Sequence, residues 1–313
     1  MGKEFRQAVW DERLDEDLRA ILALAIREDL GTSGDWTTRA LVAEDAMGRG
    51  AIVARRPGVV AGLPGVAATL AAVEPRLRWS PQTEDGRPVA QGDCAGTIEG
   101  PARGLLAAER IVLNLLGRLS GIATLTRQYV DAVAGTKARI YDTRKTTPGW
   151  RRLEKYAVRC GGGWNHRCGL DEAVLIKDNH LAIVGRVAGL SCCDKPVRQL
   201  TPAEAVSRAR QFVERNGGDT NMVIEVEVDT LEQLDTVLTA GPDIVLLDNM
   251  NPAQLGEAVA RRNAVDPTIE LEASGGVNLS TARSIALSGV ERISVGALTH
   301  SAVALDFGLD WVR

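Results

Sequence analysis

The stretch MVIEVEVDTLEQLDTVLTAGPDIVLLDN, residues 222–249, joins two short apolar runs through a segment with helical spacing. The runs MVIEVEV and DIVLLDN are typical of buried strands, and TLEQLDTVLTA between them is typical of a helix. A strand, a helix and a second strand form the repeating unit of a parallel sheet. This stretch therefore predicts one βα unit of a parallel α/β fold.

The same alternation extends over the second half of the chain. The candidate strands are ARIYDT (138–143), AVLIKD (173–178), MVIEVEV (222–228), DIVLLDN (243–249), TIELEAS (268–274) and RISVGA (292–297). At or just beyond their carboxyl ends lie Arg144, Lys145, Lys177, Glu227, Asp248, Ser274 and Gly296. A closed barrel brings such ends to one mouth, whereas an open doubly wound sheet scatters them. We therefore predict a barrel rather than an open sheet.

The first half of the chain has a different pattern. Apolar residues recur at helical spacing from Leu14 until Gly31, which is a stop signal. Strand-like runs and a short helical segment follow, and a long helix is predicted around Leu105 to Val133. Within it, Gly117 and Gly121 would let another segment approach closely. This half predicts an α/β domain of its own.

Length and composition fit an enzyme with one large domain or two unequal ones, since the chain has 313 residues of which 45% are hydrophobic. No apolar run approaches the roughly 20 residues that cross a bilayer. The opening MGKEFRQAVWDERLDEDLR is charged and lacks the apolar core of a signal peptide. Cytoplasmic residence is therefore expected.

Five cysteines, an odd number without regular spacing, are typical of reduced thiols: Cys94, Cys160, Cys168, Cys192 and Cys193. Cys160, His166 and Cys168 lie close in sequence, but the paired spacing of zinc sites is absent. We expect spectator thiols there rather than a zinc site, and the sequence assigns no role to the adjacent pair Cys192 and Cys193.

The stretch DTRKTTPGWRRLEKYAVRCGGGWNHRCGLDEAVLIKDNH, residues 142–180, is basic although the whole chain has a formal net charge of −4. A cleft lined in this way attracts carboxylates or phosphates. Taken singly, Arg144, Arg167 and Lys177 are compatible with solvated surface cations. Their placement by strand ends instead favours an anion site, and guanidinium groups bind planar carboxylates bidentately.

This stretch resembles the signature of quinolinate phosphoribosyltransferases, the decarboxylating enzymes of NAD synthesis, in DTRKTTPG, LEKYAV, GGG, NHR and LIKDNH. REDLGTSGDWTT, GVVAGLP and AERIVLNLLGRLSGIAT extend the resemblance over essentially the whole chain. It implies an N-terminal α/β sandwich domain (1–120) and a TIM-like, incomplete α/β barrel (121–300), with a tail of about 301–313 on the first domain. Trp150, Trp164 and the segment 181–200 depart from the family pattern.

The resemblance implies that quinolinate and phosphoribosyl pyrophosphate are converted to nicotinate mononucleotide, CO2 and pyrophosphate, without a covalent enzyme intermediate or an organic cofactor. It assigns quinolinate recognition to Arg144, His166, Arg167 and Lys177. Thr143 joins the substrate-binding set, and Arg144 and Lys145 also reach phosphoribosyl pyrophosphate.

Glu227 and Asp248 each end an apolar strand. Singly, each is as compatible with a structural role, capping the next helix or pairing with a barrel lysine, as with a functional one. Beside a phosphate donor they suggest Mg²⁺, held largely through pyrophosphate and water. The resemblance places both acids near the ribose and makes them catalytic together with Lys145 and Lys177. Glu227 is preferred to Glu225, which points the same way, because it is nearer the carboxyl end.

EASGG (272–276) and SVGALTH (294–300) are similar to a phosphate cradle, because glycines let backbone N–H groups approach a phosphate and a helix follows each. The resemblance places the ribose 5-phosphate against Ser274, Gly275, Gly276, Val295, Gly296 and Ala297, with His300 nearby. GGG at 161–163 either contacts a ligand or only turns the chain.

Arg110 on the long helix has the pattern of a solvated residue. The resemblance instead implies that it reaches a partner's site, so a homodimer with composite sites, or a larger oligomer, is expected. No nucleic acid or membrane partner is expected. Two alternatives are a relative linked to molybdenum transport with another acceptor and a non-catalytic phosphate-binding barrel. The presence of Arg110, Lys145 and the other predicted site residues argues against both.

Overall fold

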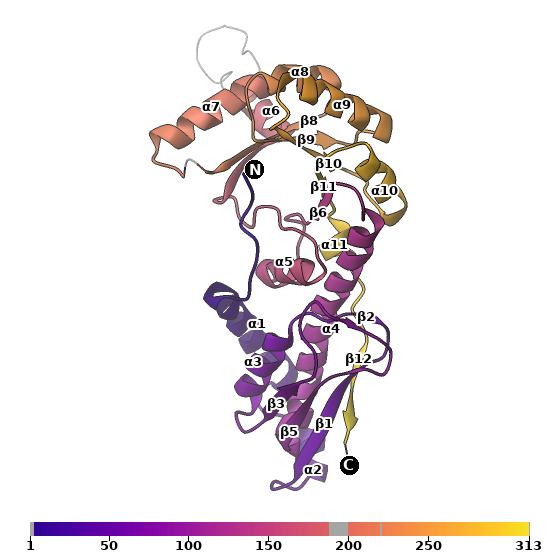
Figure 1. Cartoon of the computed structure of the whole chain (residues 1–313). Coiled ribbons are helices and arrows are strands. Elements are labelled where there is room, and N and C mark those ends of the chain that lie inside the picture. The colour runs from indigo at the N-terminus through magenta and orange to yellow at the C-terminus, as the bar shows by residue number, and fades with distance from the viewer. Residues whose placement is uncertain (1–2, 188–199, 220, 313) are drawn as a thin grey trace. The chain divides into compact units, whose positions relative to one another are not determined.

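The structure is a computed structural model that describes residues 3–187, 200–219 and 221–312 (Figure 1). Cys192, Cys193 and most of the segment 181–200 lie outside these residues. The chain divides into two compact units. The barrel unit comprises Met1–Arg6, Asp131–Arg144 and Asn165–Val295, and the antiparallel unit comprises Gln7–Val130, Lys145–Trp164 and Gly296–Arg313.

The barrel unit is built on a six-stranded parallel sheet in the order β6-β11-β10-β9-β8-β7. Its strands are β6 (Arg139–Tyr141), β7 (Ala173–Ile176), β8 (Val223–Val228), β9 (Ile244–Asp248), β10 (Glu270–Ser274) and β11 (Arg292–Ser294). Strands that are consecutive from β7 to β11 are neighbours, and the last strand returns to pair with β6. Because the sheet begins at β6 and ends at β7, it is a TIM-like barrel left open between these two strands. All six predicted strands and the predicted barrel are confirmed.

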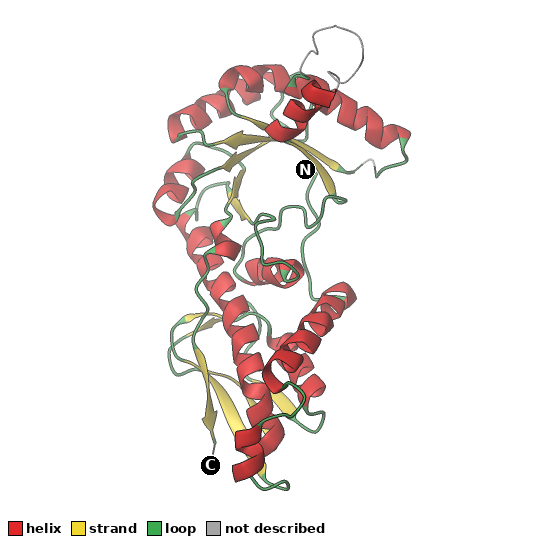
Figure 2. Cartoon of the chain, turned by 180° about the vertical axis from the view of Figure 1, so that it is seen from behind, coloured by secondary structure: helices red, strands yellow, loops and turns green. Residues whose placement is uncertain are grey.

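Helices follow the strands of this sheet and cover its outer face (Figures 1 and 2). They are α6 (Asp178–Val187), α7 (Pro202–Arg215), α8 (Leu231–Leu238), α9 (Pro252–Val265) and α10 (Leu279–Leu287). Apolar strand residues such as Val226, Leu247 and Leu271 are fully buried. No helix in the described part of the chain is long and apolar enough to span a membrane.

The antiparallel unit contains a four-stranded sheet in the order β12-β1-β5-β3 and a two-stranded sheet of β2 and β4. Its strands are β1 (Met47–Ala54), β2 (Gly58–Val59), β3 (Arg78–Pro81), β4 (Pro88–Val89), β5 (Cys94–Pro101) and β12 (Phe307–Trp311). Its helices are α1 (Glu12–Leu30), α2 (Trp36–Leu41), α3 (Leu63–Val73), most of α4 (Ala102–Ala132), α5 (Arg151–Cys160) and α11 (Ala297–His300). Ile52, Leu70, Ile98, Leu105 and Phe307 belong to one apolar core.

Helix α4 carries the two glycines for which a close approach was predicted. A Cβ atom on Gly121 would lie 2.1 Å from the Val303 carbonyl oxygen. The Leu305 N–H donates a hydrogen bond to the Gly117 carbonyl at 2.9 Å. The predicted close contact is confirmed, and it is what lets the end of the chain run along α4 before it pairs with β1 as β12.

Candidate active site

Four polar residues lie at the carboxyl ends of neighbouring strands in the barrel unit. Asp248 is the last residue of β9 and pairs in register with Ser274, the last residue of β10. Glu227 is the second-to-last residue of β8, and Lys177 directly follows β7. The Lys177 ammonium contacts the Glu227 carboxylate. The structure therefore brings together residues that the sequence predicted for one mouth.

The two acids do not cap the helices that follow them. Helix α8 is capped by the Thr230 side chain, and α9 by Asn251 in a capping box. Pairing with a lysine, the other alternative, is what the structure shows for Glu227. Asp248 accepts a hydrogen bond from the Asn249 side chain at 2.7 Å. Both carboxylates thus remain at the strand ends, and Glu227 lines a pocket of about 200 Å³.

Arg167 is a buried cation with unused hydrogen-bonding capacity. It is 6% exposed, and its guanidinium donates to the Ala173 carbonyl at 2.8 Å. Its Nε is buried and has no hydrogen-bond partner in the part of the chain that is described. Burial, and next the positive charge of Arg144, lower the pKa of Arg167, while Glu225 opposes them. Two guanidinium groups close enough to repel each other make a site suited to an anion.

His166 lies next to Arg167 and is held by the protein at both ring nitrogens. Its Nδ1 accepts a hydrogen bond from the Arg167 backbone N–H at 2.8 Å, which places the ring proton on Nε2. Nε2 in turn faces a Glu225 carboxylate oxygen at 2.9 Å. The fully buried Asp142 accepts from the His166 N–H and from the Asn165 amide. The ring of His166 is therefore positioned by the protein on several sides.

His166, Glu225 and Glu272 form a buried cluster whose ligand atoms lie within 4.8 Å of one another. Burial raises the pKa of each carboxyl to about 7, and Glu225 further raises that of Glu272. Such spacing resembles a metal site. However, the proton on His166 Nε2 removes the lone pair with which an imidazole binds a metal. The cluster is better described as a buried polar core that holds protons.

The loop after β10 contains two glycines that the sequence predicted for a phosphate cradle. Gly275 and Gly276 have positive φ values of 88° and 61°. A Cβ atom on Gly275 would lie 2.1 Å from the Asn249 side-chain oxygen. Only glycine combines that backbone conformation with this close approach. Helix α10 then begins after Asn278, which caps it.

Gly296, Ala297 and His300, which were predicted to lie near the phosphate, belong to the antiparallel unit together with Lys145. A Cβ atom on Gly296 would lie 3.0 Å from Lys145 Cδ and 3.1 Å from His300 Nε2. The Thr299 hydroxyl donates to the Lys145 carbonyl at 2.8 Å. Ala297 begins α11 beside them. Val295 is buried in the barrel unit, where its N–H donates to the Tyr141 carbonyl, and Thr143 is partly exposed after β6.

Arg110 is exposed on α4 in the antiparallel unit. It lines a pocket of about 210 Å³ together with Glu28 and Asp29 of α1 and with Trp150. Sequence similarity alone pointed to Arg110, because an exposed helical arginine has no distinguishing pattern.

GGG at 161–163 packs against α4 within the antiparallel unit. A Cβ atom on Gly161 would lie 2.5 Å from the Ala123 carbonyl oxygen, and one on Gly163 would lie 2.7 Å from Thr126. These glycines serve close packing at the end of α5, which agrees with the reading in which they only turn the chain. Cys160 beside them is a free thiol whose pKa burial raises to about 12, so it stays protonated.

Sequence reasoning missed several residues that hold the site in place. Asp142 and Glu154 both lie in quoted signature stretches, but nothing in their spacing indicated that they are fully buried. Glu4 and Phe5 lie far from the signature in sequence, and no periodicity marks them. The signal that could have been used for Asp142 and Glu154 is an acid of unassigned role inside a basic, glycine-rich segment.

Comparison with known proteins gives one consistent result. Residues 122–310 match the family "Quinolinate phosphoribosyl transferase, C-terminal domain" and residues 35–120 match the corresponding N-terminal domain. The chain is 45% identical over 294 residues to a nicotinate-nucleotide pyrophosphorylase [carboxylating] of Mycobacterium leprae, covering 93% of this chain and 96% of that one. It is 37% identical to a quinolinate phosphoribosyltransferase [decarboxylating] of Nicotiana tabacum, covering 94% and 82%.

Solved structures agree with these matches. The nicotinate-nucleotide pyrophosphorylase of Francisella tularensis superposes with a TM-score of 0.85 at 31% identity, covering 99% of this chain and all of that one. The Ehrlichia chaffeensis enzyme of the same name superposes with a TM-score of 0.79 at 36% identity, covering 94% and 98%.

Proposed function

The chain belongs to the quinolinate phosphoribosyltransferase family, and we propose that the arginines of its barrel unit bind the two carboxylates of quinolinate. The reaction transfers the phosphoribosyl group from phosphoribosyl pyrophosphate to the pyridine nitrogen and releases pyrophosphate. Loss of the ring 2-carboxylate then gives nicotinate mononucleotide. The buried Arg167 is the observation that supports this assignment best, since its Nε has no partner among the described residues. A carboxylate supplies an acceptor for Arg167 and negative charge close to Arg144.

In the transfer step, positive charge develops at one end of the breaking bond and negative charge at the other. Each is stabilised by protein charges of the opposite sign. Departure of pyrophosphate leaves positive character on the anomeric carbon, and we assign its stabilisation to Glu227 and Asp248. We assign Lys145 and Lys177 to the negative charge on the leaving group. Because Lys177 contacts Glu227, substrate binding would exchange this ion pair for contacts with the substrate.

The two acids also fit Mg²⁺. They lie on the neighbouring strands β8 and β9 and are partly exposed there. Mg²⁺ in proteins uses one or two carboxylates and completes its coordination with water and substrate phosphates. We propose that Glu227 and Asp248 hold it largely through pyrophosphate and water, where it would neutralise charge on the leaving group.

Decarboxylation needs less stabilisation from the protein's side chains than the transfer step does. Loss of CO2 leaves an anion beside the positively charged ring nitrogen, which acts as an internal electron sink. The role that we assign to the chain is to hold the ring and exclude water, and the burial of Arg167 supports this role. No covalent enzyme nucleophile is needed.

The ribose 5-phosphate is assigned to the two glycine-containing loops. Ser274, Gly275 and Gly276 supply one of them in the barrel unit, and Val295 precedes the other. Gly296, Ala297 and His300 belong to the antiparallel unit, where Gly296 lies beside Lys145. Backbone N–H groups at glycines bind phosphate without a side chain in the way.

The assembly and the compartment are also proposals. We propose a homodimer in which Arg110 of each subunit completes the partner's site, and the exposure of this cation on α4 supports the proposal. The free thiols of Cys94, Cys160 and Cys168 fit a reducing compartment, and the cytoplasm remains our prediction.

The direct test is an assay of the purified chain with quinolinate, phosphoribosyl pyrophosphate and Mg²⁺. We expect nicotinate mononucleotide, pyrophosphate and CO2 in equal amounts. Nicotinate in place of quinolinate should be a very poor substrate, since an arginine left unpaired in a buried site costs about 2–5 kcal/mol. Turnover of both acids at equal rates would contradict the assignment of Arg144 and Arg167, and no turnover of quinolinate would contradict the function itself.

A further inference from the structure

Residues 3–5 lie inside the barrel unit, and Lys3 is at the amino ends of its strands. The Lys3 ammonium donates to the Met222 carbonyl at 3.1 Å and to the Asp243 carboxylate at 3.4 Å. Met222 directly precedes β8 and Asp243 directly precedes β9. This end of the barrel is opposite the one where Asp248 and Ser274 lie. Lys3–Phe5 therefore enters the barrel from the side that faces away from the predicted mouth.

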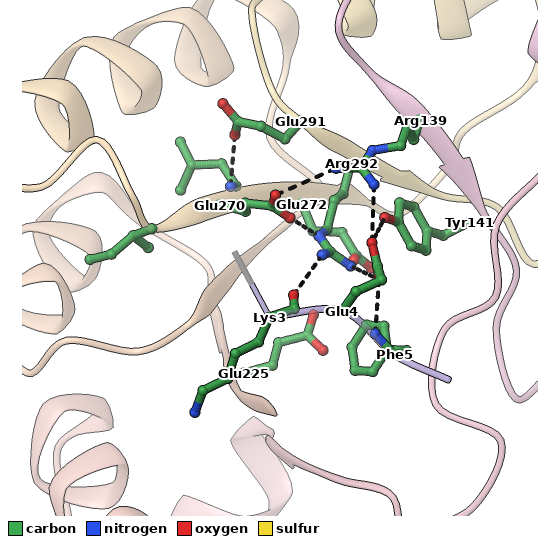
Figure 3. Close-up of polar contacts among 12 residues, drawn as sticks. Lys3, Glu4, Phe5, Arg139, Tyr141, Glu225, Glu270, Glu272, Glu291 and Arg292 are labelled. Atoms are coloured by element: carbon green, nitrogen blue, oxygen red, sulfur yellow. Dashed lines mark hydrogen bonds and ion pairs between the residues drawn. The ribbon is translucent and has the colours of Figure 1, made fainter. Parts of the chain in front are cut away.

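Glu4 completes the charge balance of this interior (Figure 3). Its carboxylate contacts Arg139 at 3.1 Å, the Tyr141 hydroxyl at 2.7 Å and Arg292 at 3.0 Å. Arg292 has no exposed surface and also contacts Glu270. A buried guanidinium needs carboxylate partners, and Glu4 supplies one that does not come from the barrel's own strands.

Phe5 covers His166. The two rings are stacked with their centroids 4.2 Å apart, and both residues are almost completely buried. The Arg292 guanidinium also lies over the Phe5 ring, 5.4 Å from its centroid. Phe5 therefore contacts both Arg292 and His166, whose Nδ1 accepts a hydrogen bond from the Arg167 N–H.

The position of these contacts matters because the sheet is open between β6 and β7. Glu4 contacts Arg139 and Tyr141 of β6, while Phe5 contacts His166 in the segment that leads to β7. No strand pairing joins these two sides in the described sheet. The Lys3–Phe5 segment thus provides a packed connection where strand hydrogen bonds do not.

We propose that Lys3–Phe5 forms the floor of the quinolinate site and that Phe5 is a positioning residue for His166 and, through it, for Arg167. The inference rests on the proposed function, since it assumes that Arg167 binds a quinolinate carboxylate. Phe5 itself does not touch the substrate. It holds the imidazole flat against the polar core, so that the backbone N–H at Arg167 and the guanidinium beyond it keep one position. Precise placement of a binding cation over a small rigid ligand requires such support.

The test compares Phe5→Leu with the wild-type enzyme. Leucine keeps most of the apolar volume but removes the stacked ring. We expect the KM for quinolinate to rise about tenfold, the KM for phosphoribosyl pyrophosphate to stay within about twofold, and Tm to fall by only a few degrees. Phe307→Leu is the matched control, because Phe307 is a similarly buried phenylalanine in the core of the antiparallel unit. It should leave both KM values unchanged.

A second measurement reports on the ring directly. The chain has three histidines, so its histidine NMR signals are few, and the signal lost in His166→Asn identifies His166. Stacking under Phe5 should shift the His166 ring protons upfield by its ring current, and Phe5→Leu should remove that shift. The wild-type assay comes first. If the wild type does not use quinolinate, the proposed function has failed before the role of Phe5 is tested.

The outcomes are distinct once the wild type is active. A selective loss of quinolinate affinity with a moved His166 signal supports the proposal. Equal weakening of both substrates, or an unchanged KM for quinolinate when the His166 signal has moved, overturns it. If Phe5→Leu does not fold, Glu4→Gln replaces it, since it keeps the shape of the segment and removes only the carboxylate charge that faces Arg139 and Arg292. The same selective rise in the KM for quinolinate is then expected, about threefold to tenfold, and its absence overturns the proposal.

Discussion

The Arg118 guanidinium lies 2.6 Å from a carboxylate oxygen of Glu154, whose side chain is fully buried. Glu154 also accepts hydrogen bonds from the N–H and the hydroxyl of Thr147. Arg118 reaches the carbonyl oxygens of Thr299 and Ala302. This one pair therefore ties the loop that carries Lys145 to the segment that carries His300, all within the antiparallel unit.

Glu154→Gln should lower both stability and affinity for phosphoribosyl pyrophosphate. The amide keeps the size of the side chain but leaves a partly buried guanidinium without its counter-charge, which costs about 3 kcal/mol. Urea unfolding measures the stability and steady-state kinetics the KM. Glu84→Gln is the control, because Glu84 and Arg87 form an exposed pair worth less than about 1 kcal/mol. A Glu154→Gln enzyme as stable as the control variant would refute the positioning role.

Arg167→Lys should raise the KM for quinolinate about tenfold to a hundredfold. The ammonium preserves the charge but cannot reproduce a planar fork, and hydrogen bonds to charged groups are worth about 1.5–3 kcal/mol. The KM is compared with that of Arg208→Lys, which lies on the exposed surface of α7 and should behave as wild type. An unchanged KM in Arg167→Lys would count against bidentate binding.

Mixtures of Arg110→Ala and Lys145→Ala enzymes should recover activity if each site combines two subunits. Each homodimer is expected to be nearly inactive. After exchange about half the dimers are mixed, and each mixed dimer has one intact site, so activity should reach about a quarter of wild type. The control is a mixture of the Lys145→Ala and Lys177→Ala enzymes. It should not recover activity, because one subunit supplies both lysines of a site and every site in a mixed dimer therefore keeps one defect. If the first mixture recovers no activity although subunit exchange is demonstrated, Arg110 acts within its own subunit or has only a structural role.

Glu272→Gln should change how stability depends on pH. Burial, and next Glu225, raise the pKa of Glu272 from 4.5 to about 7 in the folded chain. The folded chain therefore holds this proton more tightly than the unfolded chain does, so the stabilisation is present below pH 4.5 and is lost as pH rises to about 7. The loss is at most about 1.4 kcal/mol per pH unit.

Thermal unfolding at pH 5.5 and pH 8 measures this difference. The Tm of Glu272→Gln relative to wild type should be higher at pH 8 than at pH 5.5, because glutamine cannot ionise. Glu84→Gln at an exposed position should show the same offset at both values. An offset for Glu272→Gln that does not change with pH would mean that Glu272 titrates near its ordinary pKa.

Local pattern was enough to predict the barrel and the residues at its strand ends. The apolar runs of β8 and β9 and the helix between them follow directly from residues 222–249. Asp248 and Ser274 were predicted to lie at one barrel mouth, and they pair in register at the ends of β9 and β10. These features are encoded by periods of two and 3.6 residues along the chain, which a sequence displays by itself. The same holds for the long helix α4 with Gly117 and Gly121 on it.

The support beneath the site was decided only by the tertiary structure. The contacts of Glu4 with Arg292 and of Phe5 with His166 join residues far apart in the chain, and no local period relates them. Glu225, Glu272, Arg292 and Glu154 are charged residues that base rates assign to the surface, yet all are fully buried. Partners from other elements compensate the burial of Arg292 and Glu154, whereas the burial of Glu225 and Glu272 raises their pKa values. Both effects exist only once the barrel or the α4–α5 packing has formed.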